Sequence, residues 1–307
     1  MSAITIKDLK KYYGDIKAVD GVSLEVEEKE IFGILGPNGA GKTTTMEMVE
    51  TLREPDSGEI TVMGMSARKD ARAVKQIIGV QLQTTVFFDT LTVWETIDLF
   101  GAFYPRTLAV DELVALAELQ EKADARVNEL SGGQHKRLSI ALALVNDPSI
   151  VFLDEPTTGL DPQARRQLWE LIEHFKTAGR TIILTTHYMD EAERLCDRVA
   201  IMDHGRIIAL GTPRELVGSM GVDHVVEFSI GGGAPDLTAL GRLDGVRLAH
   251  SDDGVYQLQV TQLHVAVPAL LAELARCSIP LTELRTHSAT LEDVFVSLTG
   301  RHLRDDN

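Results

Sequence analysis

The pattern of hydrophobic and polar positions changes its period near the start of the chain. Apolar and polar residues alternate over residues 4–6 and 22–26, which predicts half-buried strands near an antiparallel edge. Residues 30–35, EIFGIL, instead form a continuous apolar run that leads into a glycine-rich segment, and residues 43–52 follow with helical spacing. The order predicted here is strand, loop and helix. Residues 55–60, PDSGEI, then supply a turn into another strand.

The middle of the chain is mainly helical in its spacing. Residues 93–103 and 110–122 read as long amphipathic helices. We therefore expect a helical subdomain at about residues 85–145.

Strands and helices alternate after this subdomain. Residues 149–155, SIVFLDE, and 181–187, TIILTTH, are short apolar runs, and residues 165–179 between them have an amphipathic helical pattern. Such alternation predicts a parallel sheet whose functional loops lie at the carboxyl ends of its strands. Residues 199–211 read as a further strand pair that turns at His204-Gly205.

The last third of the chain has a different order of elements. We place the domain boundary at residues 218–221, which gives a first domain of residues 1–218 and a second of residues 219–307. The expected elements of the second are a strand at 225–230, a helix at 236–240, a strand at 246–251, a turn at Asp253-Gly254, a strand at 255–260, a helix at 264–276, a strand at 280–286 and a final helix at 291–298. This βαββαβ order predicts a small α+β domain of the ferredoxin-like type.

Composition narrows the class of protein. The chain has 307 residues, of which 44% are hydrophobic and 25% charged, as in folded globular proteins. Thirty basic and 46 acidic residues give a net charge of −16, which argues against nonspecific nucleic-acid binding. No stretch approaches the ~20 apolar residues needed to cross a bilayer, and two distant cysteines fit a reducing compartment. We expect a cytoplasmic chain.

The segment GPNGAGKT, from Gly36 to Thr43, carries the clearest chemistry. It fits the pattern GxxxxGK[ST], in which backbone amides and a helix N-terminus surround the phosphates of a nucleotide. Lys42 is expected at the β- and γ-phosphates, and the Thr43 hydroxyl at Mg²⁺. The residues expected to bind ATP in this segment are Gly36, Pro37, Asn38, Gly39, Ala40, Gly41, Lys42, Thr43 and Thr44.

Two adjacent acids end the strand at residues 149–155. Buried carboxylates are costly unless they meet a metal, a donor or a reacting group. Because neighbouring side chains of a strand alternate in direction, we expect Asp154 to hold Mg²⁺ through water and Glu155 to act as the general base on the attacking water.

The segment LSGGQ, residues 130–134, makes the pattern specific. With the phosphate loop, Asp154, Glu155 and His187, it resembles the ATP-binding cassette (ABC) family, the ATPases that drive membrane transporters. The resemblance implies a RecA-like P-loop NTPase fold: a parallel-sheet core, an antiparallel β subdomain and a helical subdomain. It also implies that this segment contacts the γ-phosphate held by a second copy, through the residues Ser131, Gly132, Gly133 and Gln134.

The resemblance assigns further residues where sequence alone leaves alternatives. Tyr13 matches the aromatic residue that stacks on adenine, with Tyr12 as the alternative. Gln83 matches the glutamine that senses Mg²⁺ and contributes to catalysis, with Gln81 as the alternative.

Two more positions match the family at the expected spacing. Asp161, in TTGLD, matches the loop that crosses to the other copy, and His187 matches the histidine at the γ-phosphate. The catalytic set implied by the family is therefore Glu155, His187, Gln83 and Lys42. Departures are modest: Glu50 stands where an apolar residue or glycine is common, and His135 and Lys136 follow LSGGQ.

The resemblance covers residues 1 to about 218, and a separate one covers the tail. Residues 288–306 are similar to the tail of bacterial drug-resistance exporters of the daunorubicin/doxorubicin type. We expect an ATP-hydrolysing subunit of a bacterial exporter, with ATP and Mg²⁺ as cofactors. Its expected partners are a second copy, head to tail, and separate membrane permease subunits that would hold the chain at the inner face of the membrane.

Two alternatives have different functional consequences. One is a soluble ABC ATPase that acts on nucleic acid or ribosomes; the net charge and the single cassette argue against it. The other is the ATPase of an importer with a regulatory C-terminal domain, although residues 222–286 gather no recognisable ligand site.

Overall fold

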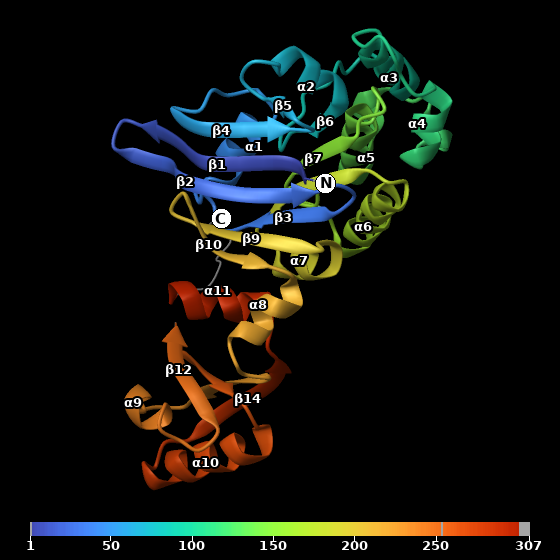
Figure 1. Ribbon diagram of the computed structural model, residues 1–307. Helices are drawn as coiled ribbons and strands as arrows, with labels where there is room; N and C mark the ends of the chain where they lie inside the picture. Colours follow the sequence, from blue (N-terminus) through green and yellow to red (C-terminus); the bar gives the residue numbers. More distant parts are fainter. Residues whose placement is uncertain (1, 253, 301–307) are drawn as a thin grey trace. The chain divides into compact units, whose positions relative to one another are not determined.

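The computed structural model describes residues 2–252 and 254–300 (Figure 1). The chain divides after Gly211 into two compact units, and each unit contains its own sheet or sheets. In the described ranges, no helix combines the length and the apolar character needed to span a membrane.

An antiparallel sheet opens the first unit. Its strand order is β2-β1-β4-β5, with β1 at Ser2–Tyr13, β2 at Ile16–Glu27, β4 at Ser57–Val62 and β5 at Met65–Ser66. Ile4 lies opposite Val26, and Ile6 lies opposite Leu24. All four side chains are buried, so the alternation in the sequence correctly predicted this paired edge.

A six-stranded sheet forms the core of the first unit. Its order is β10-β9-β3-β8-β7-β6, with β3 at Ile31–Leu35, β6 at Ile78–Gln81, β7 at Ile150–Asp154, β8 at Thr181–Thr186, β9 at Arg198–Asp203 and β10 at Arg206–Gly211. Neighbouring strands are parallel except for the β9–β10 hairpin. The helices that connect them are α1 at Lys42–Val49, α2 at Ala71–Ile77, α6 at Pro162–Thr177 and α7 at Met189–Leu195.

The register of this sheet brings distant segments together. Leu35 pairs with Thr186, and Asp154 pairs with Thr185, so β3, β7 and β8 end at one edge. The segments that carry the predicted chemistry continue from these ends, as expected for a parallel sheet.

The helical subdomain lies beside the sheets (Figure 1, green). It comprises α3 at Val93–Gly101, α4 at Val110–Leu116, two short 3₁₀ turns at Gln120–Lys122 and Val127–Glu129, and α5 at Gly132–Ala143. The single helix predicted for residues 110–122 is wrong, because α4 ends at Leu116. Glu118 there has a φ of 53°, a left-handed conformation that interrupts a helix, and the turn allows Leu119 to be buried.

The second unit has the predicted ferredoxin-like arrangement. Its antiparallel sheet has the order β12-β13-β11-β14, with β11 at His224–Ile230, β12 at Val246–Asp252, β13 at Val255–Val260 and β14 at Leu281–Ser288. Its helices are α8 at Pro213–Ser219, α9 at Leu237–Leu240, α10 at Leu263–Arg276 and α11 at Leu291–Thr299. Phe228, Leu258 and Leu270 belong to its buried core. Asp253 of the expected turn, and residues 301–306 of the tail, lie outside the described residues.

The helix α8 belongs to this second unit. Thr212 caps it, since the Thr212 hydroxyl accepts a hydrogen bond from the Glu215 amide and the Glu215 carboxylate accepts one from the Thr212 amide. The helix α8 contacts α11. The boundary between the two compact units therefore follows Gly211, whereas the sequence predicted it at residues 218–221.

Candidate nucleotide-binding site

The loop between β3 and α1 is shaped by glycines at two close approaches. A Cβ atom on Gly36 would lie 2.3 Å from the Met202 carbonyl oxygen, and one on Gly41 would lie 2.2 Å from that of Ala18. Gly41 also has a φ of 100° and precedes the first residue of α1. Only glycine fits both positions, so the loop can pass close to β2 and β9 and lead directly into the N-terminus of α1.

Lys42 extends along this loop. Its ammonium donates to the carbonyl oxygens of Gly36 at 2.8 Å and Pro37 at 3.1 Å, and lies 3.5 Å from Oε1 of Glu155. The side chain is 4% exposed. Burial lowers the pKa of Lys42, and the Glu155 carboxylate opposes this shift. The loop carbonyl oxygens and Glu155 therefore hold the buried Lys42 ammonium inside the loop.

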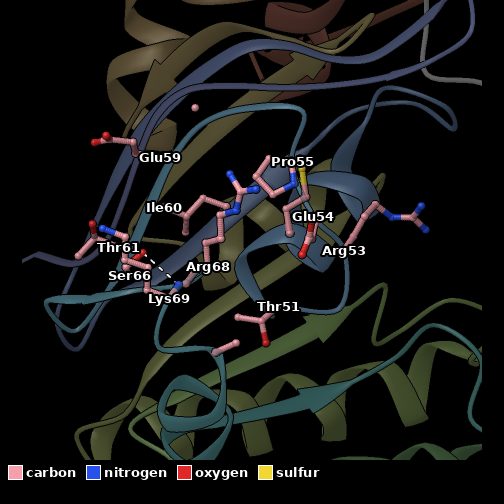
Figure 2. Close-up of a pocket in the computed structure, with 14 residues that line it drawn as sticks. Thr51, Arg53, Glu54, Pro55, Glu59, Ile60, Thr61, Ser66, Arg68 and Lys69 are labelled. Atoms are coloured by element: carbon pink, nitrogen blue, oxygen red, sulfur yellow. Dashed lines mark hydrogen bonds between the residues drawn. The ribbon is translucent and has the colours of Figure 1, made fainter.

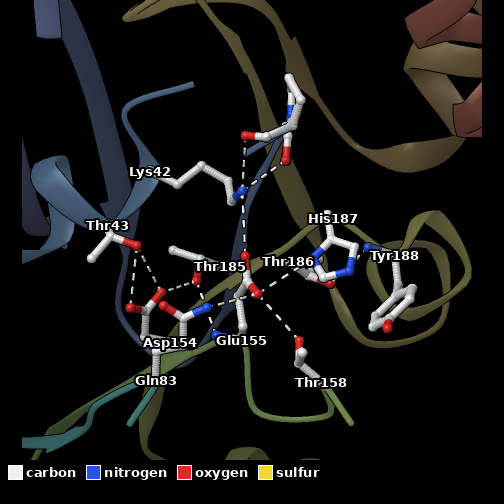
Figure 3. A network of polar contacts seen from close by, with 12 residues as sticks. Lys42, Thr43, Gln83, Asp154, Glu155, Thr158, Thr185, Thr186, His187 and Tyr188 are labelled. Carbon is white, nitrogen blue, oxygen red and sulfur yellow. Dashed lines mark hydrogen bonds and ion pairs between the residues drawn. The ribbon is translucent and has the colours of Figure 1, made fainter. Parts of the chain in front are cut away.

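Asp154 receives hydroxyl donors from two directions. Thr43 Oγ1 lies 3.3 and 3.2 Å from the two carboxylate oxygens, and the Thr185 hydroxyl donates to Oδ1 (Figure 3). Burial raises the pKa of Asp154, while both hydroxyl groups lower it. The structure places Thr43 and Asp154 together, as the sequence predicted.

Glu155 is the centre of the polar network in Figure 3. Its Oε2 accepts hydrogen bonds from Gln83 Nε2 at 3.3 Å and Thr158 Oγ1 at 3.2 Å, and His187 Nδ1 lies 3.4 Å away. The hydrogen bond from His187 holds the pKa of Glu155 down at about 2, and the charge of Lys42 acts in the same direction against burial. Glu155 is therefore a carboxylate at neutral pH.

The structure distinguishes the two candidate glutamines. Gln81 ends β6, is 2% exposed and donates to the Leu82 carbonyl oxygen. Gln83 follows the strand and reaches Glu155. Of the two glutamines, Gln83 is therefore the one that contacts the Glu155 carboxylate.

A cavity of about 770 Å³ adjoins the phosphate loop. Residues 38–44, Gln83 and Glu155 form one wall, and residues 15–18 and Arg206 line it as well. A separate hollow of about 470 Å³ lies between the end of α1 and β4, with Arg53 and Arg68 on its wall (Figure 2). Because none of the predicted phosphate contacts lines this second hollow, the site is the cavity at the loop.

The two tyrosines point to different partners at the end of β1. The Tyr13 hydroxyl accepts a hydrogen bond from Arg53 at 2.5 Å, and the Tyr12 hydroxyl donates to Asp20 at 2.6 Å. Asp20 lines the nucleotide cavity, whereas neither tyrosine does. The geometry leaves adenine stacking by Tyr13 as a prediction.

The signature segment lies apart from this cavity. Ser131 caps α5: its hydroxyl accepts a hydrogen bond from the Gln134 amide, and the Gln134 side chain accepts one from the Ser131 amide. Asp161 likewise caps α6 by accepting hydrogen bonds from the amides of Gln163 and Ala164. No residue of 130–134 lines the cavity of its own chain.

Sequence reasoning missed three residues of the network. Thr158 and Thr185 donate to the two acids, and the Lys136 ammonium donates to backbone carbonyl oxygens of Gln83 and Glu155. The two threonines stand inside motifs that the sequence singled out, TTGLD and TTH, so their position was a usable signal. Lys136 was noted in the sequence only as a departure after LSGGQ, and no role was assigned to it.

A glycine-rich loop at the end of a parallel strand, a buried lysine, and an Asp-Glu pair on the adjacent strand end define a phosphate-loop nucleoside triphosphatase. Comparison with known proteins narrows this class. The ABC transporter family model matches residues 19–158.

Relatives match nearly the whole chain. Nod factor export ATP-binding protein I of Paraburkholderia xenovorans (strain LB400) is 40% identical over 99% of this chain and 99% of its own length. The protein of the same name from Rhizobium sp. (strain N33) is 40% identical over 98% of each. A dimeric ATP-binding cassette solved with ADP and Pi has a TM-score of 0.62 and 28% identity, over 68% of this chain and 98% of its own. The chain belongs to the ABC transporter family, as an ATP-hydrolysing ATP-binding subunit.

Proposed function

We propose that this chain powers an exporter, in which two copies act head to tail beneath separate membrane subunits. The observation that carries the proposal is the division of the site: the phosphate loop, Gln83 and Glu155 line one cavity, whereas Ser131 lies at the start of another helix and does not line it. A helix N-terminus is suited to an anion. One chain therefore offers a phosphate-binding half and a phosphate-contacting half, and residues 130–134 of the second do not line the cavity of the first.

Hydrolysis would begin with water aligned by Glu155 for in-line attack on the γ-phosphorus. A base whose pKa is about 2 is weak. The γ-phosphate would compete for Lys42 and His187, which lower this pKa, and its own negative charge would raise it.

The donor set fits Mg²⁺. The Thr43 hydroxyl and the Asp154 carboxylate are oxygen donors that lie within 3.3 Å of each other, and Mg²⁺ prefers oxygen ligands together with water and substrate phosphates. Thr43 would hold the ion, with Asp154 acting through water and Gln83 near it. The ion would supply charge neutralisation at the phosphates.

The membrane partner would dock near the loop that follows Gln83. Leu82, Val86 and Phe88 expose 45%, 88% and 61% of their surface. Apolar side chains gathered this way on a surface mark interaction sites. Their link to Gln83 would connect docking to the catalytic carboxylate.

The direction and cargo rest on resemblance. The relatives that match the whole chain are named for Nod factor export, which supports export over import, and these matches include the second unit. As a finer proposal, the tail resemblance points to drug export of the daunorubicin/doxorubicin type. The second unit would stabilise the pair of copies, and the chain would sit at the cytoplasmic face through its permease.

Mixed pairs test the head-to-tail arrangement. Lys42→Ala removes the lysine that should bind the phosphates, and Ser131→Arg disrupts the signature residue that should contact the γ-phosphate. Each variant by itself should therefore be inactive. A mixture contains pairs with one intact composite site, because each chain supplies the part that the other lacks. In an equal mixture about half of the pairs combine one chain of each kind, and each such pair has one of its two sites intact, so recovery of about a quarter of the wild-type ATPase rate is expected. A mixture as inactive as its components would contradict the composite site.

Reconstitution tests the transport assignment. The full chain would be copurified with a polytopic membrane subunit, placed in vesicles, and assayed for ATP-dependent movement of drugs and amphipathic glycans. Movement away from the ATP-containing side supports export, and the opposite direction contradicts it.

A further inference from the structure

Lys136 crosses from the signature helix to the catalytic strand end of the same chain. Its ammonium donates to the carbonyl oxygen of Gln83 at 3.5 Å and to that of Glu155 at 3.3 Å. The helix that carries it, α5, begins at the Ser131 cap. Lys136 therefore contacts the backbone of both Gln83 and Glu155, the two residues proposed to act on the attacking water.

Lys136 lies in a partly buried and negatively charged environment. The side chain is half-buried, and the negative charges of Asp154, Glu155 and Glu191 all act on it. In the described part of the chain it forms no ion pair within 4 Å, so its bonds to the two carbonyl oxygens do not compete with a carboxylate. A partly desolvated ammonium that reaches two carbonyl oxygens fixes both of them.

The next residue shows that the contact is specific to position 136. Arg137 turns to Glu118 at 2.7 Å, in the turn after α4, and to Gln167 at 2.6 Å, on α6. Lys136 and Arg137, which are consecutive on α5, thus contact different parts of the structure. Arg137 secures α5 within the fold, and Lys136 reaches the catalytic edge.

A cavity lies beside this contact. It has a volume of about 310 Å³ and is lined by Gln83, Gly132, Lys136, Thr158 and Gly159, among others. Among the hydrogen bonds of the described residues, those from α5 to Gln83 and to Glu155 come from Lys136. Beside this cavity, Lys136 supplies the hydrogen bonds that join α5 to the backbone of Gln83 and Glu155.

We propose that Lys136 is a positioning residue that couples the two halves of the composite site. When Ser131 engages the γ-phosphate held by a second copy, the shift of α5 is passed through Lys136 to the backbone of Gln83 and Glu155 in its own chain. Hydrolysis in one site thereby depends on engagement at the other. This inference rests on the paired function proposed above.

The test compares three full-length variants. Lys136→Met removes the charge at similar volume, Lys136→Arg keeps a donor, and Arg137→Met is the matched loss of a cation from the same helix. Loss of a charged hydrogen-bond donor predicts a kcat about 10- to 100-fold lower for Lys136→Met. The KM for ATP should stay within about threefold of wild type, and the Hill coefficient should fall towards 1. Lys136→Arg should restore rate and cooperativity, and Arg137→Met should lower Tm without removing cooperativity.

Mixed pairs locate the effect. With Glu155→Gln in one chain, that chain still holds ATP for its partner's Ser131, and the live site uses the phosphate loop and the Glu155 of the other chain. Lys136→Met placed in the chain that supplies this live phosphate loop should slow hydrolysis more than the same change in its partner, by on the order of threefold or more. A structural defect of the signature helix would give the opposite order.

The outcomes separate the two proposals. An inactive wild type would overturn the composite-site function and this inference together. An active wild type with an equally active and cooperative Lys136→Met variant overturns the role of Lys136 and leaves the function standing. Equal losses from Lys136→Met, Lys136→Arg and Arg137→Met would also reject it.

Discussion

The two halves of the proposed composite site are built in different ways. At the phosphate-loop half, Lys42 and Glu155 are 4% and 6% exposed and interlock with neighbouring donors. At the signature half, Ser131 and Asp161 are exposed and bond to the first turns of their own helices. One half is a buried network complete within the chain; the other is a pair of helix caps. The contrast indicates where a second copy is needed.

The same contrast separates stability from catalysis. Removing one member of a buried polar network leaves its partners unpaired, which costs more than loss of an exposed group. A helix cap is worth about 1 kcal/mol wherever it stands. Changes at the signature half should therefore affect hydrolysis far more than folding.

The largest effect is expected at the buried half. Glu155→Gln removes the general base but keeps the volume and one acceptor oxygen, so kcat should fall by about 10²- to 10⁴-fold. ATP should still bind and hold the pair closed. Phosphate release and size-exclusion chromatography with ATP measure both results. Glu118→Gln, an exposed acid beside Arg137, is the control, and a Glu155→Gln variant with the wild-type rate would contradict the assignment.

The signature half should respond next, and in a different way. Ser131→Ala removes a cap and a proposed phosphate contact, so kcat should fall by about 10- to 100-fold, with a stability loss of about 1 kcal/mol. Thr212→Ala is the matched control, because Thr212 forms the same type of capping box with Glu215 in the second unit. Thermal unfolding and ATPase assays compare them. Equal ATPase losses would show that capping alone accounts for the result.

The rim of the phosphate-loop half should show a smaller effect. If Tyr13 stacks on adenine, Tyr13→Ala should raise the KM for ATP by about 3- to 10-fold with little change in kcat. Tyr12→Ala breaks the bond to Asp20 and should raise it less. Initial rates measured across ATP concentrations give both KM values. A larger increase in KM for Tyr12→Ala than for Tyr13→Ala would assign adenine stacking to Tyr12.

The smallest effect on activity is expected at Glu50, a buried acid outside the catalytic set. Burial, followed by the charges of Asp154 and Glu47, raises its pKa from 4.5 to about 8. The folded state keeps this proton up to about pH 8 whereas the unfolded chain loses it near 4.5, so folding loses stability as pH rises between these values. Glu50→Gln removes that penalty.

The gain should be largest above pH 8, at about 1 to 3 kcal/mol, and small near pH 5. Thermal unfolding at pH 5 and 8.5 with a chelator present measures it, and Glu54→Gln, an exposed neighbour, is the control. A gain that is independent of pH would show that Glu50 titrates normally.

Local pattern predicted the elements where a motif or a period was contiguous. The buried runs at 30–35 and 149–155 became β3 and β7, and the βαββαβ order gave the second unit its topology. The sequence-based predictions were wrong where contacts between residues far apart in the chain determine where a helix ends or a unit begins. The break after Leu116 places Leu119 in the core, and the pairing of α8 with α11 moves the boundary to Gly211.

The sequence by itself indicated the phosphate loop and the acid pair, because each is a short segment whose expected chemistry follows from residue types and spacing, and resemblance to the family added the signature. Tertiary structure decided which groups meet. The choice of Gln83 over Gln81, the Thr185 bond to Asp154, and the reach of Lys136 to Glu155 depend on the register of β6, β7 and β8 and on the placement of α5. Such contacts join residues far apart in the chain, and only the packed fold fixes their distance.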